Sequence, residues 1–291
     1  MFPANRNLFA IAILLFSLPA MSGTESKVSI EAVSFAAATM VDGDARVKGE
    51  LRTPAGNPEK IPAVVVIHNA AGLSDRTGSA YIEALNAAGI ATLELDLFTK
   101  GNAPASTRGH IPHTYGSLIF LANHPRIDKD RIGIMGFSYG AILSMVTASS
   151  DLTATYTGGS YRFAAHLPLY FPCWTGTAVI DGKIKSYNQN LWNSTTGSPI
   201  LILAGDKDDY GDPDMCPKFV EALPESARKH TVVTVYPGAF HGWDTFEDRT
   251  YFDKFAFGGK GGTVRHFRNP DIAEKSKAAT VQFFKNAFDL K

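Results

Sequence analysis

Short apolar runs alternate with amphipathic helical patterns along most of the chain. The continuous run "PAVVVIH" at 62–68 predicts a buried strand. The next segment, 79–89, places its apolar residues on one helical face and stops at Gly89, a residue typical of helix C-termini. A second apolar run follows at 90–98. This alternation predicts an α/β fold with a mainly parallel central sheet and helices on both faces.

The same pattern continues to the end of the chain. Further strands are predicted at 131–137, 163–171, 199–206 and 232–238. Asn269, Pro270 and Asp271 form a helix-start signal, and the closing helix follows them. No internal repeat or long linker divides the chain, so we expect a single domain over residues 23–291.

Two predicted loops interrupt the alternation of strands and helices without changing the predicted α/β fold class. The polar segment 173–199 is rich in turn residues and predicts an excursion over the strand ends, too short for a large cap domain. The segment "FGGKGG" at 257–262 superficially resembles a phosphate-binding loop. It lacks the Gly-Lys-Ser/Thr ending and the strand-to-helix context, which favours a flexible loop.

The first 22 residues have the pattern of a secretory signal peptide. Arg6 precedes the apolar run 8–18, and small residues follow at Ala20 and Ser22, where signal peptidase is expected to cut. The run is shorter than the roughly 20 residues of a membrane span, although an uncleaved anchor or a buried helix is the alternative. We therefore expect a periplasmic or secreted protein without a stable membrane anchor.

Charge and cysteine content narrow the possible partners. Lys plus Arg and Asp plus Glu both number 28, so no basic excess favours nucleic acid. Cys173 and Cys216 are the only cysteines. In an oxidising compartment we expect them to form a disulfide, with two free buried thiols as the alternative. Their spacing fits no zinc motif, and the sequence does not indicate an oligomeric state.

The segment "RIGIMGFSYGAILS" at 131–144 contains a Gly-x-Ser-x-Gly motif centred on Ser138. The motif alone is modest evidence, but here a predicted strand ends at the serine and a predicted helix begins after it. A sharp turn between the two lifts the serine hydroxyl above the sheet, and the flanking glycines avoid collisions with neighbouring backbone. We therefore predict that Ser138 is a nucleophile.

A serine nucleophile needs a base and an acid, which in this arrangement follow it in the chain. His241, in "YPGAFHGWD", lies after a predicted strand and is the expected base. The preceding loop, "LILAGDKDDYGDP", offers several acids. We favour Asp208, because a carboxylate several residues past a strand can reach back toward the histidine loop. Asp209 is the reserve candidate, and Asp206 at the strand end is expected to brace the turn.

An oxyanion hole would complete such a site. One N–H donor is expected from Tyr139, the residue after the nucleophile. The other is assigned to Ala70 in "VVVIHNAAGL", where small residues after the strand let the backbone approach a substrate. A plain tight turn is the alternative for this second loop.

Taken together, "VVVIHNAAGL", "RIGIMGFSYG", "GDKDD", "YPGAFHGW" and "NPDIAEKSKAATVQFF" resemble the dienelactone hydrolase family of α/β-hydrolases. The resemblance runs from about residue 64 to 284. It implies an α/β-hydrolase fold, Asp208 as the acid, His241 as the base, oxyanion donors at Ala70 and Tyr139, and no organic cofactor. The namesake enzymes carry a cysteine nucleophile and a glutamate near the first oxyanion strand, whereas this chain has Ser138 and Asn69, which favours a general carboxylesterase. With its two cysteines and its predicted export, the chain resembles a secreted, serine-nucleophile branch of the family.

The expected function is therefore a carboxylic ester hydrolase that cleaves small-molecule esters or lactones through an acyl-enzyme. The alternatives are a serine peptidase or amidase of the same fold, and a catalytically silent relative that binds a ligand. Several aromatic residues near strand ends either line a substrate pocket or serve as packing: Phe98, Tyr170, Trp174, Trp192 and Trp243. Arg108 is expected to be a surface residue.

Overall fold

The computed structural model describes residues 28–38, 45–56 and 60–291, so the predicted signal peptide lies outside the described residues. An eight-stranded sheet has the order β1-β2-β4-β3-β5-β6-β7-β8. Its strands are β1 (Val28–Ala36), β2 (Arg46–Pro54), β3 (Ile61–Ile67), β4 (Ala91–Asp96), β5 (Ile127–Phe137), β6 (Ala165–Leu169), β7 (Ile200–Gly205) and β8 (Thr231–Tyr236). Strand β2 is antiparallel to both β1 and β4, and all other neighbours are parallel. The prediction of a mainly parallel sheet is confirmed.

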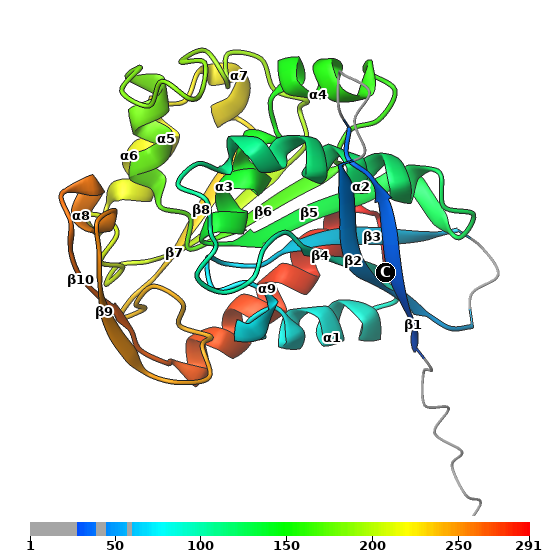
Figure 1. Cartoon of the computed structure of the whole chain (residues 1–291), viewed down its shortest axis with the longest axis horizontal. Helices are drawn as coiled ribbons and strands as arrows, with labels where there is room; N and C mark the ends of the chain where they lie inside the picture. The colour runs from blue at the N-terminus through cyan, green and yellow to red at the C-terminus, as the bar shows by residue number, and fades with distance from the viewer. Residues whose placement is uncertain (1–27, 39–44, 57–59) are drawn as a thin grey trace, which may run out of the picture.

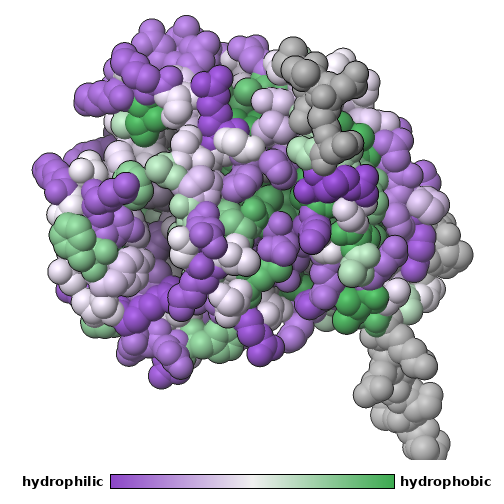
Figure 2. All heavy atoms as spheres, viewed as in Figure 1, coloured by the Kyte–Doolittle hydropathy of each residue, from purple (hydrophilic) through white to green (hydrophobic). Residues whose placement is uncertain are grey.

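The central strand β3 shows why both faces of this sheet are covered. Its seven residues are all buried. Ala63, Val65 and Ile67 belong to one apolar cluster, whereas Val64 and Val66 belong to a second cluster. Because successive side chains of a strand point to opposite faces, a continuous apolar run needs helices on both sides. Hydrophilic side chains cover most of the molecular face shown in Figure 2.

Helices pack on the two faces of the sheet (Figure 1). The longer ones are α1 (Ser79–Ala87), α2 (Ile111–Ala122), α3 (Tyr139–Val146), α4 (Ser150–Thr157), α5 (Cys173–Ile180), α6 (Met215–Ala222) and α9 (Pro270–Ala287). The short ones are α7 (Glu225–Arg228), α8 (Ala256–Gly259), η1 (Leu73–Asp75) and η2 (Thr107–His110). Helices α1 and α9 lie on one face, opposite α2 and α3. The side chain of Asn269 caps α9 by accepting from the Ile272 N–H at 3.2 Å, as the helix-start signal predicted.

Three parts of the chain differ from the sequence-based expectation. The segment 173–199, predicted as an irregular excursion, begins with the helix α5. A separate hairpin of β9 (Arg249–Asp253) and β10 (Gly262–His266) was not predicted, and α8 connects its strands where we expected only a flexible loop. Strands β1 and β2 were also missed. Strand β1 is mostly exposed and β2 carries four charged residues, so neither has a continuous buried apolar run.

Candidate active site

Ser138 lies on a tight turn between β5 and α3. Its backbone angles are φ 50° and ψ −102°, a conformation that L-residues rarely adopt. The turn requires very close backbone approaches on both sides. A Cβ atom added at Gly136 would lie 2.2 Å from the Gly140 carbonyl carbon, and one at Gly140 would lie 2.3 Å from the Ile67 oxygen. The two glycines of the motif are therefore needed for the serine to occupy this position.

The predicted serine, histidine and aspartate come together in one hydrogen-bonded row. The Oγ atom of Ser138 lies 2.9 Å from Nε2 of His241. The other ring nitrogen, Nδ1, lies 2.8 Å from Oδ2 of Asp208. An ionised carboxylate can only accept, so Nδ1 carries the proton of the neutral ring. Nε2 is then free to accept the proton of the serine hydroxyl.

The first three acids of the loop after β7, Asp206, Asp208 and Asp209, have different partners. The second oxygen of Asp208, Oδ1, accepts the Tyr210 N–H at 2.9 Å, which orients the carboxylate toward His241. Asp206 accepts the Gly238 N–H at 2.6 Å and so braces the turn after β8, as expected. Asp209 points away from the histidine. Geometry therefore separates Asp208 from its neighbours.

Asp209 instead holds the hairpin β9–β10 against this loop. Its buried carboxylate accepts three bonds from Arg265: from Nη2 at 2.6 Å and from Nε and the backbone N–H at 2.9 Å each. Its backbone oxygen also accepts the Phe257 N–H at 2.8 Å. In the sequence, Asp209 stands out only as a second acid next to Asp208. Its partner Arg265 is 56 residues away along the chain, so no local pattern could predict that the two would pair.

Aromatic side chains surround the imidazole of His241, which is only 1% exposed. The rings of Tyr210 and Tyr170 lie with centroids 4.4 and 4.9 Å from it. A second histidine, His266, lies 5.1 Å away. Burial, together with the nearby His241 and Arg249, lowers the pKa of His266 to about 2. His266 therefore stays neutral and adds no positive charge beside His241.

Asp244 follows His241 by three residues and is the remaining acid beside the imidazole. Its carboxylate accepts the hydroxyl of Tyr81 at 2.8 Å and that of Tyr170 at 3.1 Å. Burial raises the pKa of Asp244 to about 6, although both hydroxyl donors oppose this shift. Sequence reasoning did not single out this group, because its tyrosine partners are remote in the chain.

The loop after β3 and the turn at Ser138 border one cavity. Ala70, Ser138 and Tyr139 all border the same cavity. Within the described residues, neither the Ala70 N–H nor the Tyr139 N–H has a hydrogen-bond acceptor. His68 holds the loop from below, because its Nε2 accepts the Leu97 N–H at 3.2 Å and its Nδ1 donates to the Asn69 oxygen at 2.8 Å.

Asn69 extends this bracing into the next turn. Its Oδ1 accepts the Ala71 N–H at 2.8 Å, and its Nδ2 donates to Asp75 at 2.6 Å. Arg249 of the hairpin donates to the other Asp75 oxygen at 3.2 Å. Burial by itself would raise the pKa of Asp75, but the bonds from Asn69 and Thr77 and the charge of Arg249 lower it below its ordinary value. The carboxylate therefore stays ionised as an acceptor for the loop.

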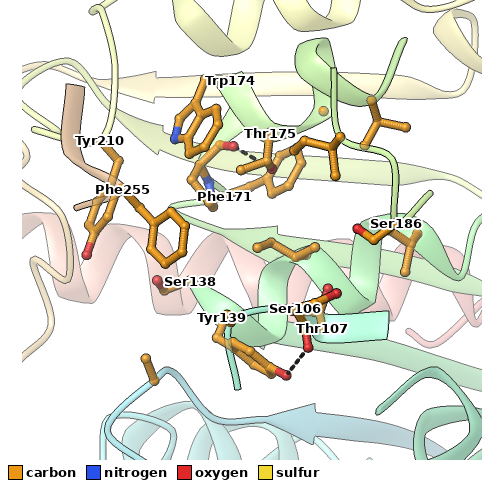
Figure 3. Close-up of a pocket in the computed structure, with 18 of the residues that line it drawn as sticks. Ser106, Thr107, Ser138, Tyr139, Phe171, Trp174, Thr175, Ser186, Tyr210 and Phe255 are labelled. Atoms are coloured by element: carbon orange, nitrogen blue, oxygen red, sulfur yellow. Dashed lines mark hydrogen bonds between the residues drawn. The ribbon is translucent and has the colours of Figure 1, made fainter. Parts of the chain in front are cut away.

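A cavity of about 370 Å³ opens beside Ser138 (Figure 3). Trp174 and Trp192 line it, whereas Phe98, Tyr170 and Trp243 pack elsewhere. Two of the five aromatic residues singled out in the sequence therefore belong to the cavity. Arg108 is exposed and does not line it, as expected for a surface arginine.

The predicted disulfide between Cys173 and Cys216 is present, with Cα atoms 5.1 Å apart. It joins the first residue of α5 to α6. The two helices pack closely, since a Cβ atom added at Gly176 would lie 2.4 Å from the ring of Phe219. Because α5 forms one wall of the cavity, the disulfide supports that wall as well as the segment after the Asp208 loop.

Residues 28–38, 45–56 and 60–291 offer neither a metal site nor a membrane span. They contain no cluster of three or more His, Cys, Asp or Glu residues able to hold a metal ion. In the same part of the chain, no helix combines the length and the apolar character that crossing a membrane requires.

One comparison identifies a family, and the solved structures show the fold. The sequence model of the dienelactone hydrolase family matches residues 47–288. No curated protein matches the sequence. Among solved structures, Est1E from Butyrivibrio proteoclasticus superposes with a TM-score of 0.59 at 16% identity, covering 89% of this chain and 99% of that one.

Two further structures carry the family name in their descriptions. The dienelactone hydrolase of Anabaena variabilis has a TM-score of 0.56 at 17% identity, covering 89% of this chain and 98% of its own. The dienelactone hydrolase-like promiscuous phosphotriesterase P91, from metagenomic libraries, has a TM-score of 0.58 at 16% identity, with the same coverage of 89% and 98%. At these identities, the likeness shows a common α/β-hydrolase fold.

Proposed function

The chain belongs to the dienelactone hydrolase family and is a carboxylic ester hydrolase, and from this premise we propose that it cleaves esters or lactones through a Ser138–His241–Asp208 triad. The observation that carries the proposal is the continuous hydrogen-bonded row of 2.9 and 2.8 Å from the serine hydroxyl through the imidazole to the carboxylate. These distances lie within the reach that nucleophile, base and orienting acid require.

The first half of the reaction transfers the acyl group to the enzyme. His241 Nε2 takes the Ser138 proton as Oγ forms a bond to the ester carbonyl carbon. Asp208 stabilises the resulting imidazolium, and the Ala70 and Tyr139 N–H groups donate to the oxyanion, each such donor being worth about 10²- to 10³-fold in rate. The bond from carbon to the alcohol oxygen then breaks, and His241 passes its proton to that oxygen.

The second half returns the enzyme to its starting state. His241 takes a proton from water as the water oxygen attacks the acyl carbon. The bond to Ser138 Oγ breaks, the serine regains a proton from the imidazolium, and the carboxylic acid leaves. Every group that moves a proton in this cycle belongs to the chain itself.

The test is to label the purified protein with a fluorophosphonate and to locate the adduct by mass spectrometry. We expect one adduct, on Ser138, and loss of p-nitrophenyl butyrate hydrolysis in proportion to labelling. A feruloyl ester belongs in the same panel, because Est1E has been solved with ferulic acid bound. Turnover of p-nitroanilides at a rate above that of the esters would favour the amidase. If the protein is neither labelled nor able to turn over any substrate, it is a catalytically silent binding protein.

We also propose that the protein is exported, with residues 1–22 removed as a signal peptide. A disulfide persists in oxidising compartments such as the periplasm or the extracellular space, and the Cys173–Cys216 bond fits that destination. N-terminal sequencing of protein recovered from the periplasm or the medium should begin at residue 23. A mature chain that begins at Met1 and stays inside the cell would refute export.

A further inference from the structure

The cavity beside Ser138 runs along one face of α3. Tyr139, Ile142 and Val146 line it and follow one another at spacings of three and four residues, which places them in one stripe of the helix. Val146 comes eight residues after Ser138. At a rise of 1.5 Å per residue, it lies roughly 12 Å from the nucleophile along the helix axis. Successive residues of this stripe therefore lie at increasing distances from the Ser138 hydroxyl along the cavity.

The far end of the cavity is closed by well-held apolar groups. Val146 is 2% exposed, and Trp192 beside it is equally buried. The indole N–H of Trp192 donates to the Met145 oxygen at 3.1 Å, and its ring meets Phe219 edge-on at 5.4 Å. Because a buried indole held in this way cannot swing aside at low cost, the depth of the cavity is limited.

The walls carry almost no charge. Asp253 and Lys254 are the only ionisable acid and base among the described lining residues, and both come from the hairpin beside Phe255. The Asp253 carboxylate already has partners within the protein, because it accepts hydrogen bonds from the Tyr210 hydroxyl at 2.6 Å and from the Phe255 N–H at 2.8 Å. Lys254 lies over the Phe255 ring, 5.0 Å from its centroid. A carboxylate placed along α3 would lose its hydration beside a lining that, apart from Lys254 at the hairpin, offers hydroxyl groups but no cation to pair with it.

The position of the base indicates which part of an ester enters this cavity. The alcohol oxygen must meet His241 Nε2 to receive its proton as it leaves. His241 does not line the cavity, whereas Ser138 and both proposed oxyanion donors do. The group that extends along α3 is therefore the one that stays bonded to Ser138, the acyl group.

We propose that this cavity binds the acyl group of the ester, that this acyl group is apolar and carries no charge, and that Val146 sets the length of acyl chain the cavity accepts. The inference rests on the proposed function. The substrate class that it assigns is esters of medium-chain or aryl-alkyl acids. Esters whose acyl group carries a second carboxylate are expected to be poor substrates.

The experiment compares p-nitrophenyl acetate, butyrate, octanoate and dodecanoate, which share one leaving group. In the wild type, kcat/KM should be at least tenfold higher for octanoate than for acetate. Val146→Phe shortens the cavity and should lower the octanoate-to-acetate ratio at least tenfold, since a methylene in such a pocket is worth about 10- to 200-fold. Val146→Ala lengthens it and should raise the dodecanoate-to-octanoate ratio severalfold.

The matched control is Val232→Phe, the same change at an exposed position of β8. Its ratios should stay within twofold of wild type. Fluorophosphonate labelling and a thermal melt establish that each variant is folded, and Val146→Ala tests the inference even where Val146→Phe does not fold. Ratios that are unchanged in folded Val146 variants would overturn it.

A second comparison tests the charge argument. The mono-p-nitrophenyl ester of adipic acid carries a terminal carboxylate that p-nitrophenyl hexanoate lacks, and its kcat/KM should be at least tenfold lower. Equal or faster hydrolysis of the adipate ester would overturn the apolar assignment while leaving ester hydrolysis intact. Absence of hydrolysis of every ester would instead refute the proposed function itself.

Discussion

The hydrogen-bonded row and the acyl cavity meet at Ser138 but are built in different ways. In the row, Asp208 and His241 are 7% and 1% exposed, and each functional atom has a partner at 2.8 to 2.9 Å. In the cavity, apolar walls from α3, α5 and the segment 184–192 surround a space of about 370 Å³. Apolar contact is non-directional, whereas a hydrogen bond demands both distance and angle.

This difference implies two kinds of sensitivity. Changing one atom in the row should remove activity toward every ester, because the reacting groups act as a unit. Changing one side chain of the cavity should redistribute activity among esters.

The largest effect is expected from Ser138→Ala. Alanine has the same Cβ atom at φ 50°, so the turn should keep its fold and melting temperature. Hydrolysis of every ester in the panel should fall by at least about 10³-fold, since the oxyanion donors alone preserve only a small part of catalysis. The control is Ser160→Ala at an exposed position. Turnover within threefold of wild type would refute the mechanism.

The next effect separates two adjacent acids. Asp208→Asn removes the acceptor that holds the His241 tautomer and should lower kcat about 10³- to 10⁴-fold. Asp209→Asn weakens the contact with Arg265, so it should reduce hairpin stability and lower kcat by less than about tenfold. The measurement is kcat with p-nitrophenyl butyrate, alongside thermal melts. The reverse order would make Asp209 the functional acid.

Loss of the disulfide should act on both regions, but through stability. It closes a separation of 43 residues, for which chain entropy gives an upper figure of about 4 kcal/mol. Cys173→Ser/Cys216→Ser should therefore lower the unfolding free energy in denaturant titrations. Because the bond joins the cavity wall to the segment after the Asp208 loop, we also expect a higher KM for octanoate. Two titratable thiols in native exported protein would contradict the bond.

The smallest effect concerns Asp244, a half-buried acid near the row. Burial raises its pKa from 3.8 to about 6, so the folded state holds the proton more tightly than the unfolded state. Stability from this group is therefore complete below about pH 4 and falls as pH rises toward 6, by up to about 3 kcal/mol. Asp244→Asn imitates the protonated form and lacks this loss.

The measurement is the unfolding free energy of wild type and Asp244→Asn at pH 4 and pH 7. The variant minus wild-type difference should be more positive at pH 7, and Asp289→Asn at an exposed site is the control. A difference that does not change with pH would mean that Asp244 is already ionised at pH 4 in the folded protein.

The row was largely predictable because each of its members follows a strand with a clear apolar pattern. Ser138 follows β5, Asp208 follows β7 and His241 follows β8. Parallel strands bring their carboxyl ends to one edge of the sheet, so residues 103 positions apart can be placed together from order alone. The choice of Asp208 over Asp209 came from spacing and family resemblance, and only the coordinates show what each carboxylate contacts.

The hairpin and the cavity were not predictable in the same way. Strands β9 and β10 are five residues long, and their sequences, RTYFD and GTVRH, contain neither a long apolar run nor a regular apolar alternation that would mark them locally. Their attachment through Arg265 to Asp209 and through Arg249 to Asp75 joins residues far apart in sequence. For the same reason, Trp174 and Trp192 could not be distinguished beforehand from packing residues such as Trp243.

The sequence by itself therefore determined the alternation of the central strands β3 to β8 with helices, the turn at Ser138, and the carboxylate and the histidine that follow it in later loops. Local sterics and hydrophobic periodicity act over a few residues, so the chain displays them directly. Tertiary structure decided the length of the acyl cavity, its lack of charge and the partners of Asp209 and Asp244. These depend on which side chains from α3, α5 and the hairpin meet in space, and that information arises only when distant segments pack together.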